Sequence, residues 1–210
     1  MDQPGDPAMT SPFRSAQTRS EDRAVKRQAL LSAAVRLFNA RGFHATSLDD
    51  VAASVGVTKP LVYHYLGNKD QVLLECVSFG LDQLREVAEV ARAEPGNGLD
   101  RLKAFLRRYA EVVMGEFGRC VIRTGDEMLS ADSRARFRAA KREIDAATRE
   151  MIEAAVADGS VQVADVRLTA FTIAGALNWS ARWHNDEAGQ SRTETARDMV
   201  DILCAGLEPR

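Results

Sequence analysis

Side chains that can bind a polyanion lie close together in residues 59–69. If residues 59–66 form a helix, Lys59, Pro60, Tyr63 and His64 lie on one face of it. An ammonium, a phenol and an imidazole on one face can donate hydrogen bonds to phosphates or to the edges of bases. The other side of the helix carries residues that would face the rest of a small domain: Val62, Tyr65 and Leu66. The alternative is that Tyr63 and His64 are an ordinary solvated pair.

Two short helices joined by a glycine would position this face. Residues 46–50 read Thr-Ser-Leu-Asp-Asp, which places a hydroxyl cap three residues before a carboxylate and predicts a helix that ends near Val55. Gly56 permits a tight turn, Thr58 can cap the next helix, and Pro60 suits its first turn. This pattern is typical of a helix-turn-helix, in which the second helix enters the major groove of DNA.

A longer helix is predicted before this motif. From residue 20 the apolar residues Leu31, Ala34, Val35 and Phe38 recur at helical spacing, and a glycine stop follows at residue 42. Residues 1–19 are rich in Pro, Gly, Ser and Gln and predict a mobile arm. Two interpretations of the arm stay open. Its arginines, Arg14 and Arg19, reach the minor groove, or the arm is a tail without a DNA contact.

Charge is distributed unevenly although the chain as a whole is nearly neutral, with a formal net charge of −2 over 210 residues. Residues 14–69 hold nine Lys and Arg against four Asp and Glu, whereas residues 70–210 hold nineteen against twenty-four. A basic head followed by an acidic body indicates that the head binds a polyanion. Chance variation in composition is the alternative explanation.

The rest of the chain also shows helical patterns. Breaks near residues 67–68 and 95–98, glycines in residues 115–125, and further stops near 158–159 and 185–190 divide it into helices, the last opened by a Ser191-x-x-Glu194 capping box. No segment shows convincing strand alternation. We therefore predict an all-α chain of about nine helices. The predicted parts are residues 1–19 as the arm, 20–70 as a three-helix DNA-binding domain with its motif at about 47–66, and 71–210 as a helical body.

Several classes of protein are not supported by the sequence. The longest uncharged run, residues 168–181, is shorter than the roughly 20 apolar residues that span a bilayer, and the N-terminus does not resemble a secretory signal. We expect a cytoplasmic protein without a membrane partner. Three cysteines without a CxxC spacing and three histidines without ligand spacing predict no metal and no cofactor. No GxSxG, HExxH or phosphate loop is present, so an enzyme is not expected.

Residues 23–70 resemble the DNA-binding domain of the tetracycline-repressor-like (TetR) family of bacterial regulators. The motifs that carry the resemblance are Ala34-x-x-Leu37-Phe38, Arg41-Gly42-Phe43, Ala45-Thr46-Ser47-Leu48, Val51-Ala52-x-x-Val55-Gly56-Val57-Thr58-Lys59 and Leu61-Val62-Tyr63-His64-Tyr65-Leu66-x-Asn68-Lys69. The family commonly has Phe at the position of Leu66 and often Gly at that of Pro60. These departures concern packing and base preference and leave the resemblance intact.

The resemblance implies roles for individual residues. Ser47 and Lys69 would hold phosphates, and Tyr63 and His64 would contact the backbone or base edges. Lys59 would read a base, because its ammonium can meet guanine O6 and N7, and Pro60 would touch a thymine methyl. The DNA-binding residues expected in this way are Thr46, Ser47, Thr58, Lys59, Pro60, Leu61, Tyr63, His64 and Lys69.

For residues 71–210 the resemblance implies effector binding and dimerisation through the last two helices. Residues 168–181 carry no charge, and the interface residues expected are Ala170, Ala174, Gly175, Ala176, Ala196, Met199, Val200, Leu203 and Leu207. The alternative is that helix 168–181 is central to its own monomer. A twofold dimer would place two recognition helices roughly 34–36 Å apart on a near-palindromic operator.

The effector is the least determined part of the prediction. An apolar cavity lined by Met114, Phe117, Met128 and Phe137, with Asn178, Trp179 and Trp183 nearby, is one interpretation, and ordinary core packing is the other. The Asn-Trp-x-x-x-Trp segment resembles the branch of the family that responds to acyl-CoA or other lipid-derived ligands. Arg119, Arg123 and Arg182 would then offset a phosphate or carboxylate, unless they are solvated surface residues. The leading hypothesis is a repressor released by a small hydrophobic effector, and the alternative is a helical DNA-binding or adaptor protein without a small-molecule switch.

Overall fold

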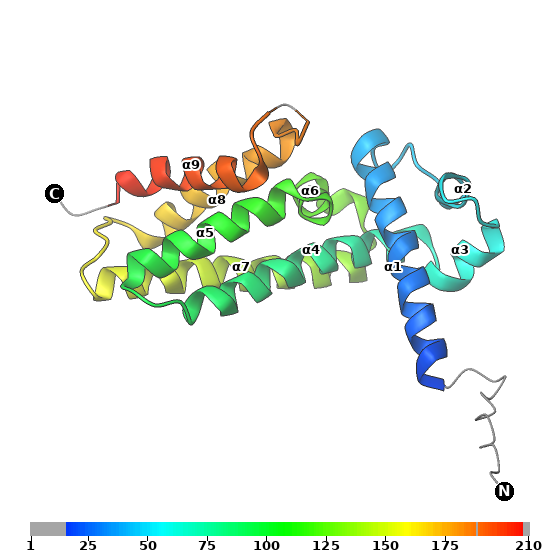
Figure 1. The fold of residues 1–210 in the computed structure, drawn as a ribbon, viewed down its shortest axis with the longest axis horizontal. Coiled ribbons are helices and arrows are strands. Elements are labelled where there is room, and N and C mark those ends of the chain that lie inside the picture. The colour runs from blue at the N-terminus through cyan, green and yellow to red at the C-terminus, as the bar shows by residue number, and fades with distance from the viewer. Residues whose placement is uncertain (1–15, 188, 208–210) are drawn as a thin grey trace, which may run out of the picture.

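The computed structural model describes residues 16–187 and 189–207, which form nine α-helices and one short 3-10 helix, with no strand among them. The all-helical prediction and the number of helices are therefore confirmed for this part of the chain. A small head and an elongated body lie side by side (Figure 1).

The head consists of α1 (Ala16–Arg41), α2 (Leu48–Ser54), α3 (Lys59–Leu66) and the first turns of α4 (Lys69–Arg92). The predicted start of the first helix at residue 20 was wrong, because α1 begins at Ala16. Hydrophobic periodicity reports a helix only where one face is buried, and residues 23–26 and 28–29 are exposed, so the N-terminal half of α1 leaves no periodic signal. Arg14 lies outside the described residues, and the two interpretations of the arm stay predictions.

Capping residues set the ends of several helices. Ser47 and Asp50 form a reciprocal capping box at the start of α2, and Asn68 with Gln71 does the same for α4. Gly56 adopts a φ of 67° between α2 and α3, a conformation that favours glycine. These local signals explain why the helix-turn-helix forms where the sequence predicts it.

The body is built from α4 together with α5 (Gly98–Met114), α6 (Glu116–Arg123), the 3-10 helix η1 (Asp126–Met128), α7 (Ala131–Ala157), α8 (Val166–Trp183) and α9 (Arg192–Ala205). Helices α8 and α9 cover α5 and α7 on one side (Figure 1). The predicted domain boundary at residue 70 falls in the first turn of α4. This helix belongs to both parts and gives the head a continuous connection to the body.

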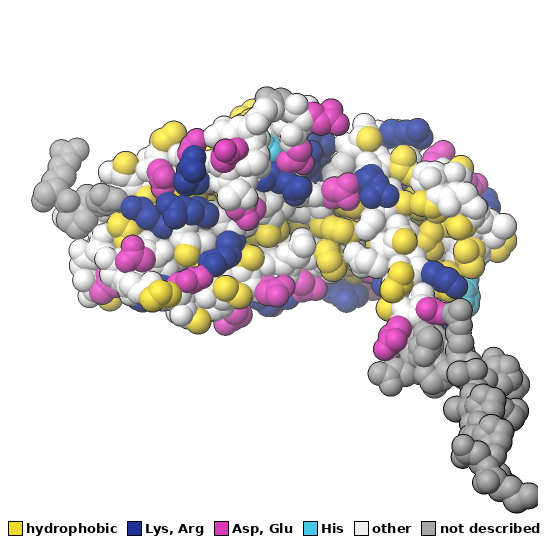
Figure 2. Space-filling view, in the orientation of Figure 1, with side chains coloured by type: hydrophobic (Ala, Val, Ile, Leu, Met, Phe, Trp, Pro, Cys, Tyr) yellow, Lys and Arg dark blue, Asp and Glu magenta, His cyan; other side chains and the backbone are white. Residues whose placement is uncertain are grey.

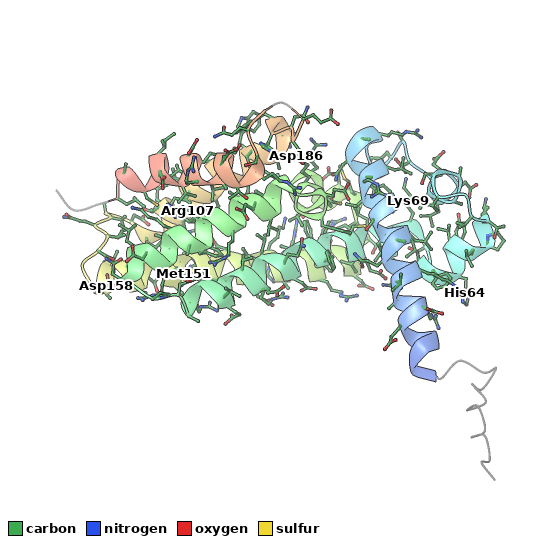
Figure 3. The ribbon with its side chains drawn as sticks, viewed as in Figure 1. His64, Lys69, Arg107, Met151, Asp158 and Asp186 are labelled. Atoms are coloured by element: carbon green, nitrogen blue, oxygen red, sulfur yellow. The ribbon has the colours of Figure 1, made fainter. Side chains whose placement is uncertain are left out.

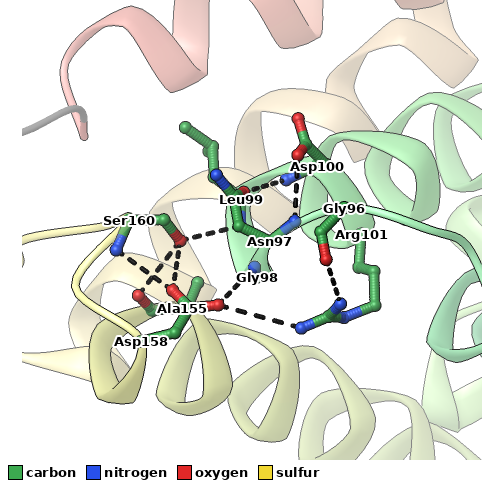
Figure 4. A network of polar contacts seen from close by, with 9 residues as sticks. All are labelled: Gly96, Asn97, Gly98, Leu99, Asp100, Arg101, Ala155, Asp158 and Ser160. Atoms are coloured by element: carbon green, nitrogen blue, oxygen red, sulfur yellow. Dashed lines mark hydrogen bonds and ion pairs between the residues drawn. The ribbon is translucent and has the colours of Figure 1, made fainter.

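The end of the body farthest from the head is closed by contacts between the α4–α5 turn and the end of α7 (Figure 4). The backbone N–H of Gly98 donates to Asp158 Oδ2 at 2.6 Å, and that of Leu99 donates to Ser160 Oγ at 3.0 Å. The first backbone N–H groups of α5, which have no partner inside their own helix, are thus bonded to the loop after α7.

No helix in the described part of the chain is both long and apolar enough to cross a membrane.

Candidate nucleic-acid interface and ligand pockets

The predicted binding face of α3 is confirmed as an exposed face. Lys59, Pro60, Leu61 and His64 are exposed, and 45% of Tyr63 is accessible. The opposite side holds Val62 and Leu66 in the core and Tyr65 half-buried. His64 lies at the outer side of the head, away from the body (Figure 3). The face is therefore accessible to a groove of DNA.

Lys59 is held by an acidic neighbour on the preceding helix. Its Nζ lies 2.7 Å from Oδ2 of Asp49 and 5.9 Å from the centroid of the Tyr63 ring. The hydrogen bond to Asp49 is the main reason that the pKa of Lys59 is raised above its ordinary value. Both groups are exposed, so a phosphate or a base can displace the carboxylate at low cost.

The three hydroxyl residues in the expected set lie in different surroundings. Thr46 is buried, and its Oγ1 donates to Gly42 O at 2.9 Å, so its hydroxyl closes the end of α1 and is not exposed to solvent. Ser47 is exposed, and its Oγ donates to Asp50 Oδ2 at 2.6 Å in the capping box. Thr58 precedes α3, is exposed and makes no side-chain cap bond.

Lys69 stands at the start of α4 next to the head. Its Nζ lies 4.3 Å from the centroid of the Phe43 ring and 3.5 Å from His44 O. Burial lowers the pKa of Lys69, and the charge of Asp50 raises this pKa and so offsets part of the shift. Figure 3 places Lys69 between α1 and α2. The ring of Phe43 fixes the position of this ammonium.

Two polar contacts that join distant segments were not found from the sequence. Arg27 of α1 pairs with Glu75 of α4 and donates to Tyr65 O at 3.2 Å. Asp70 accepts hydrogen bonds from Ser130 N–H at 2.7 Å, Ser130 Oγ at 2.9 Å and Ser133 Oγ at 2.6 Å, which join α4 to the start of α7. Local spacing contains no signal for partners separated by 38 to 63 positions.

We expect Asp70→Asn to lower the free energy of unfolding by about 2 kcal/mol at neutral pH, because hydrogen bonds to an ionised group are lost. Burial by itself raises the pKa of Asp70, but the hydrogen bonds from Ser130 and Ser133 outweigh burial and hold the pKa below its ordinary value. Since the folded pKa is the lower one, the stabilisation is present above the unfolded value and is lost as the pH falls through the folded value. Urea unfolding from about pH 7 to about pH 3 measures this. A difference between wild type and Asp70→Asn that does not shrink in acid would contradict the ionised role.

A cavity of about 170 Å³ lies inside the body between α4, α5, α6, α7 and α8. Its walls are mainly apolar, and Tyr109 Oη donates to Asn178 Oδ1 at 2.9 Å at its edge. Desolvation raises the pKa of Tyr109 to about 12, so the phenol stays neutral. Asn178 is the one residue of the expected ligand set that lines this body cavity.

The other members of the expected ligand set lie elsewhere. Met114 and Phe137 are fully buried core side chains and do not line this cavity, which agrees with their interpretation as ordinary core packing. Phe117 packs on Phe79 with ring centroids 4.5 Å apart. Trp179 and Trp183 are neither core nor cavity residues, because they are 62% and 51% exposed on the outer side of α8. Arg123 and Met128 line a different pocket at the junction of head and body.

The exposed apolar side of α8 and α9 differs from the predicted interface. Ala170, Ala196 and Val200 are buried inside the monomer, so their assignment to a subunit contact was wrong. Met199, Leu203 and Leu207 also pack on the monomer's own core. The exposed apolar residues of these helices are Leu168, Phe171, Trp179, Trp183 and Ile202.

Among the described residues, no group of three or more His, Cys, Asp or Glu side chains is arranged to hold a metal ion.

The head and its exposed α3 face define a helix-turn-helix DNA-binding protein with a helical body. Family models match both parts: residues 30–76 match "Bacterial regulatory proteins, tetR family", and residues 95–207 match "Tetracyclin repressor-like, C-terminal domain". The chain therefore belongs to the TetR family. It is a ligand-responsive DNA-binding transcriptional regulator.

Individual relatives agree with this family. The chain is 32% identical over 83 residues to the HTH-type transcriptional regulator BetI of Rhizobium meliloti. The matched segment covers 40% of this chain and 41% of BetI. The chain thus spans less than half of that relative. It is 24% identical over 187 residues to the HTH-type transcriptional activator FasR of Mycolicibacterium smegmatis, covering 88% of this chain and 84% of FasR.

Solved structures match over most of their length. The regulator PfmR from Thermus thermophilus superposes with a TM-score of 0.76 at 27% identity, covering 86% of this chain and 99% of PfmR. AibR in complex with isovaleryl coenzyme A and operator DNA gives a TM-score of 0.74 at 25% identity, covering 85% of this chain and 97% of AibR.

Proposed function

We propose that this protein is a repressor that binds a near-palindromic operator as a homodimer and leaves it when a small hydrophobic effector fills the body cavity. The observation that carries the proposal is the face of α3, where Lys59, Tyr63 and His64 are exposed opposite a buried Val62 and Leu66. Such a face can enter a major groove while the apolar side holds the helix on the head.

The outer side of α8 and α9 supports dimerisation. Leu168, Trp179 and Ile202 are 64%, 62% and 76% exposed, and their side chains make an apolar surface that is costly to leave in water. Gly175, on the exposed side of α8, has no atom within 4 Å of the position of a Cβ, so a partner helix can approach closely there. Two copies related by a twofold axis would bury this surface on both subunits.

The body cavity supports an apolar effector. Leu81, Leu84 and Ile144 supply apolar walls, and the Asn178 amide beside Tyr109 supplies a polar group. At about 170 Å³ the cavity is smaller than typical ligand sites of roughly 300–1,000 Å³, so it accommodates an acyl group or enlarges on binding. AibR was solved with isovaleryl coenzyme A, and by analogy we propose a short acyl-CoA or a related lipid-derived ligand.

The proposal is tested by recovering genomic DNA fragments that the purified protein binds at near-physiological salt. A sharp palindromic site is expected, and octanoyl-CoA is expected to release the protein from it. A reporter gene behind this site separates repression from activation. If a folded dimer recovers only unrelated fragments, the proposal of a specific operator is contradicted. If acyl-CoA does not release the protein from its site, the result favours a DNA-binding protein without a small-molecule switch.

We expect Lys69→Ala to weaken DNA binding about equally for all sequences, because this ammonium meets a phosphate and not a base. Both subunits of the dimer carry the change, so two phosphate contacts are lost and the slope of log K against log salt concentration is expected to fall by about 1.8. Fluorescence anisotropy with operator and with unrelated DNA at several salt concentrations measures both effects. A slope equal to that of the wild type would contradict the phosphate contact.

Lys59→Ala is expected to relax base preference and to change the salt slope little. A good side-chain pair with a base contributes about 1–3 kcal/mol of discrimination. The measurement compares operators that carry single substitutions in each half-site. Asp49→Ala is the control, because it removes the partner of Lys59 and keeps the ammonium. Equal loss of affinity on every operator would show that Lys59 binds a phosphate instead.

A further inference from the structure

A second pocket, here named the junction pocket, lies between the head and the body and has a volume of about 320 Å³. Phe38 and Phe43 line it from the head, and Arg123, Met128 and Arg182 line it from the body. It differs from the body cavity, which no residue of the head lines. Its volume lies within the range of small-molecule sites, roughly 300–1,000 Å³.

The junction pocket has two guanidinium groups and no carboxylate among its lining residues. Arg123 donates to Asn39 O at 2.8 Å and to Ala181 O at 3.3 Å, and both of these partners are neutral carbonyls. The guanidinium of Arg182 lies over the Trp179 ring, 5.9 Å from its centroid. Within the described residues neither Arg123 nor Arg182 forms an ion pair.

Several other arginines of the body form ion pairs with carboxylates. Arg85 and Arg107 each lie 2.7 Å from a carboxylate oxygen, and Arg138 lies 2.6 Å from one. A third arginine, Arg119, lies close to Arg123. Burial is the main cause that lowers the pKa of Arg119; the charge of Asp186 raises this pKa, and the charge of Arg123 lowers it further. In the part of the chain that the structure describes, the guanidinium groups of Arg123 and Arg182 therefore lack the carboxylate partner that Arg85, Arg107 and Arg138 have.

We propose that the junction pocket is a second ligand site, which takes a small molecule with a carboxylate or phosphate group on an apolar body. The guanidinium groups of Arg182 and Arg123 meet the anion, since planar guanidinium pairs with both kinds of oxyanion. Phe38, Phe43 and Met128 meet the apolar part. The site is separate from the body cavity in which the proposed function places an effector.

The position of the pocket connects its occupant to the DNA-binding head. Phe43 lines the pocket, and its ring also lies under the ammonium of Lys69, 4.3 Å away. Asn39, whose carbonyl binds Arg123, also donates from Nδ2 to Glu116 O at 2.8 Å and so joins α1 to α6. A ligand here touches both parts of the molecule, which is the condition for favouring one arrangement of the head over another.

The test is calorimetric titration of the full chain, without DNA, with decanoate, decyl phosphate and the neutral methyl decanoate. Both anions are expected to bind more tightly than the ester, which has no charge for the two arginines to meet. Arg182→Gln is expected to weaken both anions by about tenfold, because a charge-assisted contact is lost. Arg167→Gln is the matched control, since Arg167 also lies over an aromatic ring of α8, 5.5 Å from the Phe171 centroid, but does not line the junction pocket.

A second variant locates the bound probe. Ala174 lines the body cavity, so Ala174→Leu narrows that cavity; in this variant both anions are expected to bind still, and adding Arg182→Gln is expected to weaken them by about tenfold. Binding that Ala174→Leu abolishes and Arg182→Gln retains would overturn the junction site. Binding of the ester as tight as that of decanoate, or no binding of either anion, would overturn it as well. Because no operator is present, these results do not depend on the proposed repressor function.

Discussion

Replacing Leu168 and Ile202 together with Glu is expected to convert the dimer into monomers and to lower operator affinity by more than about 100-fold. These residues are the most exposed apolar side chains of α8 and α9, and a twofold interface would contain each of them twice. Four carboxylates buried without partners would oppose association strongly. The loss of affinity follows because the second half-site would no longer be held near the first.

Sedimentation measures the association state, and fluorescence anisotropy measures operator affinity. Val90→Glu with Val156→Glu is the matched control, because these valines are also exposed but lie on α4 and α7. Circular dichroism checks that both double variants remain helical. A Leu168→Glu, Ile202→Glu protein that stays dimeric would contradict the proposed interface, whatever its affinity for DNA.

The second large effect is expected for Gly98→Ala. A Cβ added to Gly98 would lie 2.3 Å from the Cα and 2.7 Å from the backbone N of Ala155. These are backbone atoms of α7, so no side chain can rotate away and the two helices must separate. The separation would also disturb the bonds from Gly98 N–H to Asp158 and from Leu99 N–H to Ser160 (Figure 4). We expect a loss of at least about 3 kcal/mol in the free energy of unfolding.

Thermal and urea unfolding check this expectation. For a chain of this size 3 kcal/mol corresponds to a fall in Tm of about 6–12 °C. Gly206→Ala is the control, because a Cβ there would meet only Leu203 O, at 4.0 Å, and the φ of −84° suits any residue. Unfolding of Gly98→Ala at the wild-type temperature would show that α5 and α7 do not approach each other as closely as in the structure.

Charged and apolar residues are mixed over the surface of the body, with apolar side chains gathered where the body meets the head (Figure 2). The surroundings of individual side chains were harder to predict for the body than for the head. The head has a strong alternation of buried and exposed faces on short helices, whereas residues 168–181 of α8 have no charge on any side. Periodicity then does not indicate which side faces the core. Trp179 and Trp183 lie on the outside, and Ala170, Ala196 and Val200 are buried in the monomer and not at its surface.

The sequence by itself determined the features whose causes lie within a few residues. Capping boxes join Ser47 to Asp50 and Ser191 to Glu194 across three positions, and helical spacing separates Lys59, Tyr63 and His64 from Val62 and Leu66. For the same reason the all-helical class and the exposed face of α3 were predictable.

Only the tertiary structure decided the features that depend on partners far apart in the chain. Asp70 meets Ser130 and Ser133, Gly98 meets the backbone of Ala155, and Arg123 reaches across to α1 and α8. The location of both pockets follows from the same long-range packing. Their positions depend on how helices of different parts approach one another, and local propensity contains no information about that approach.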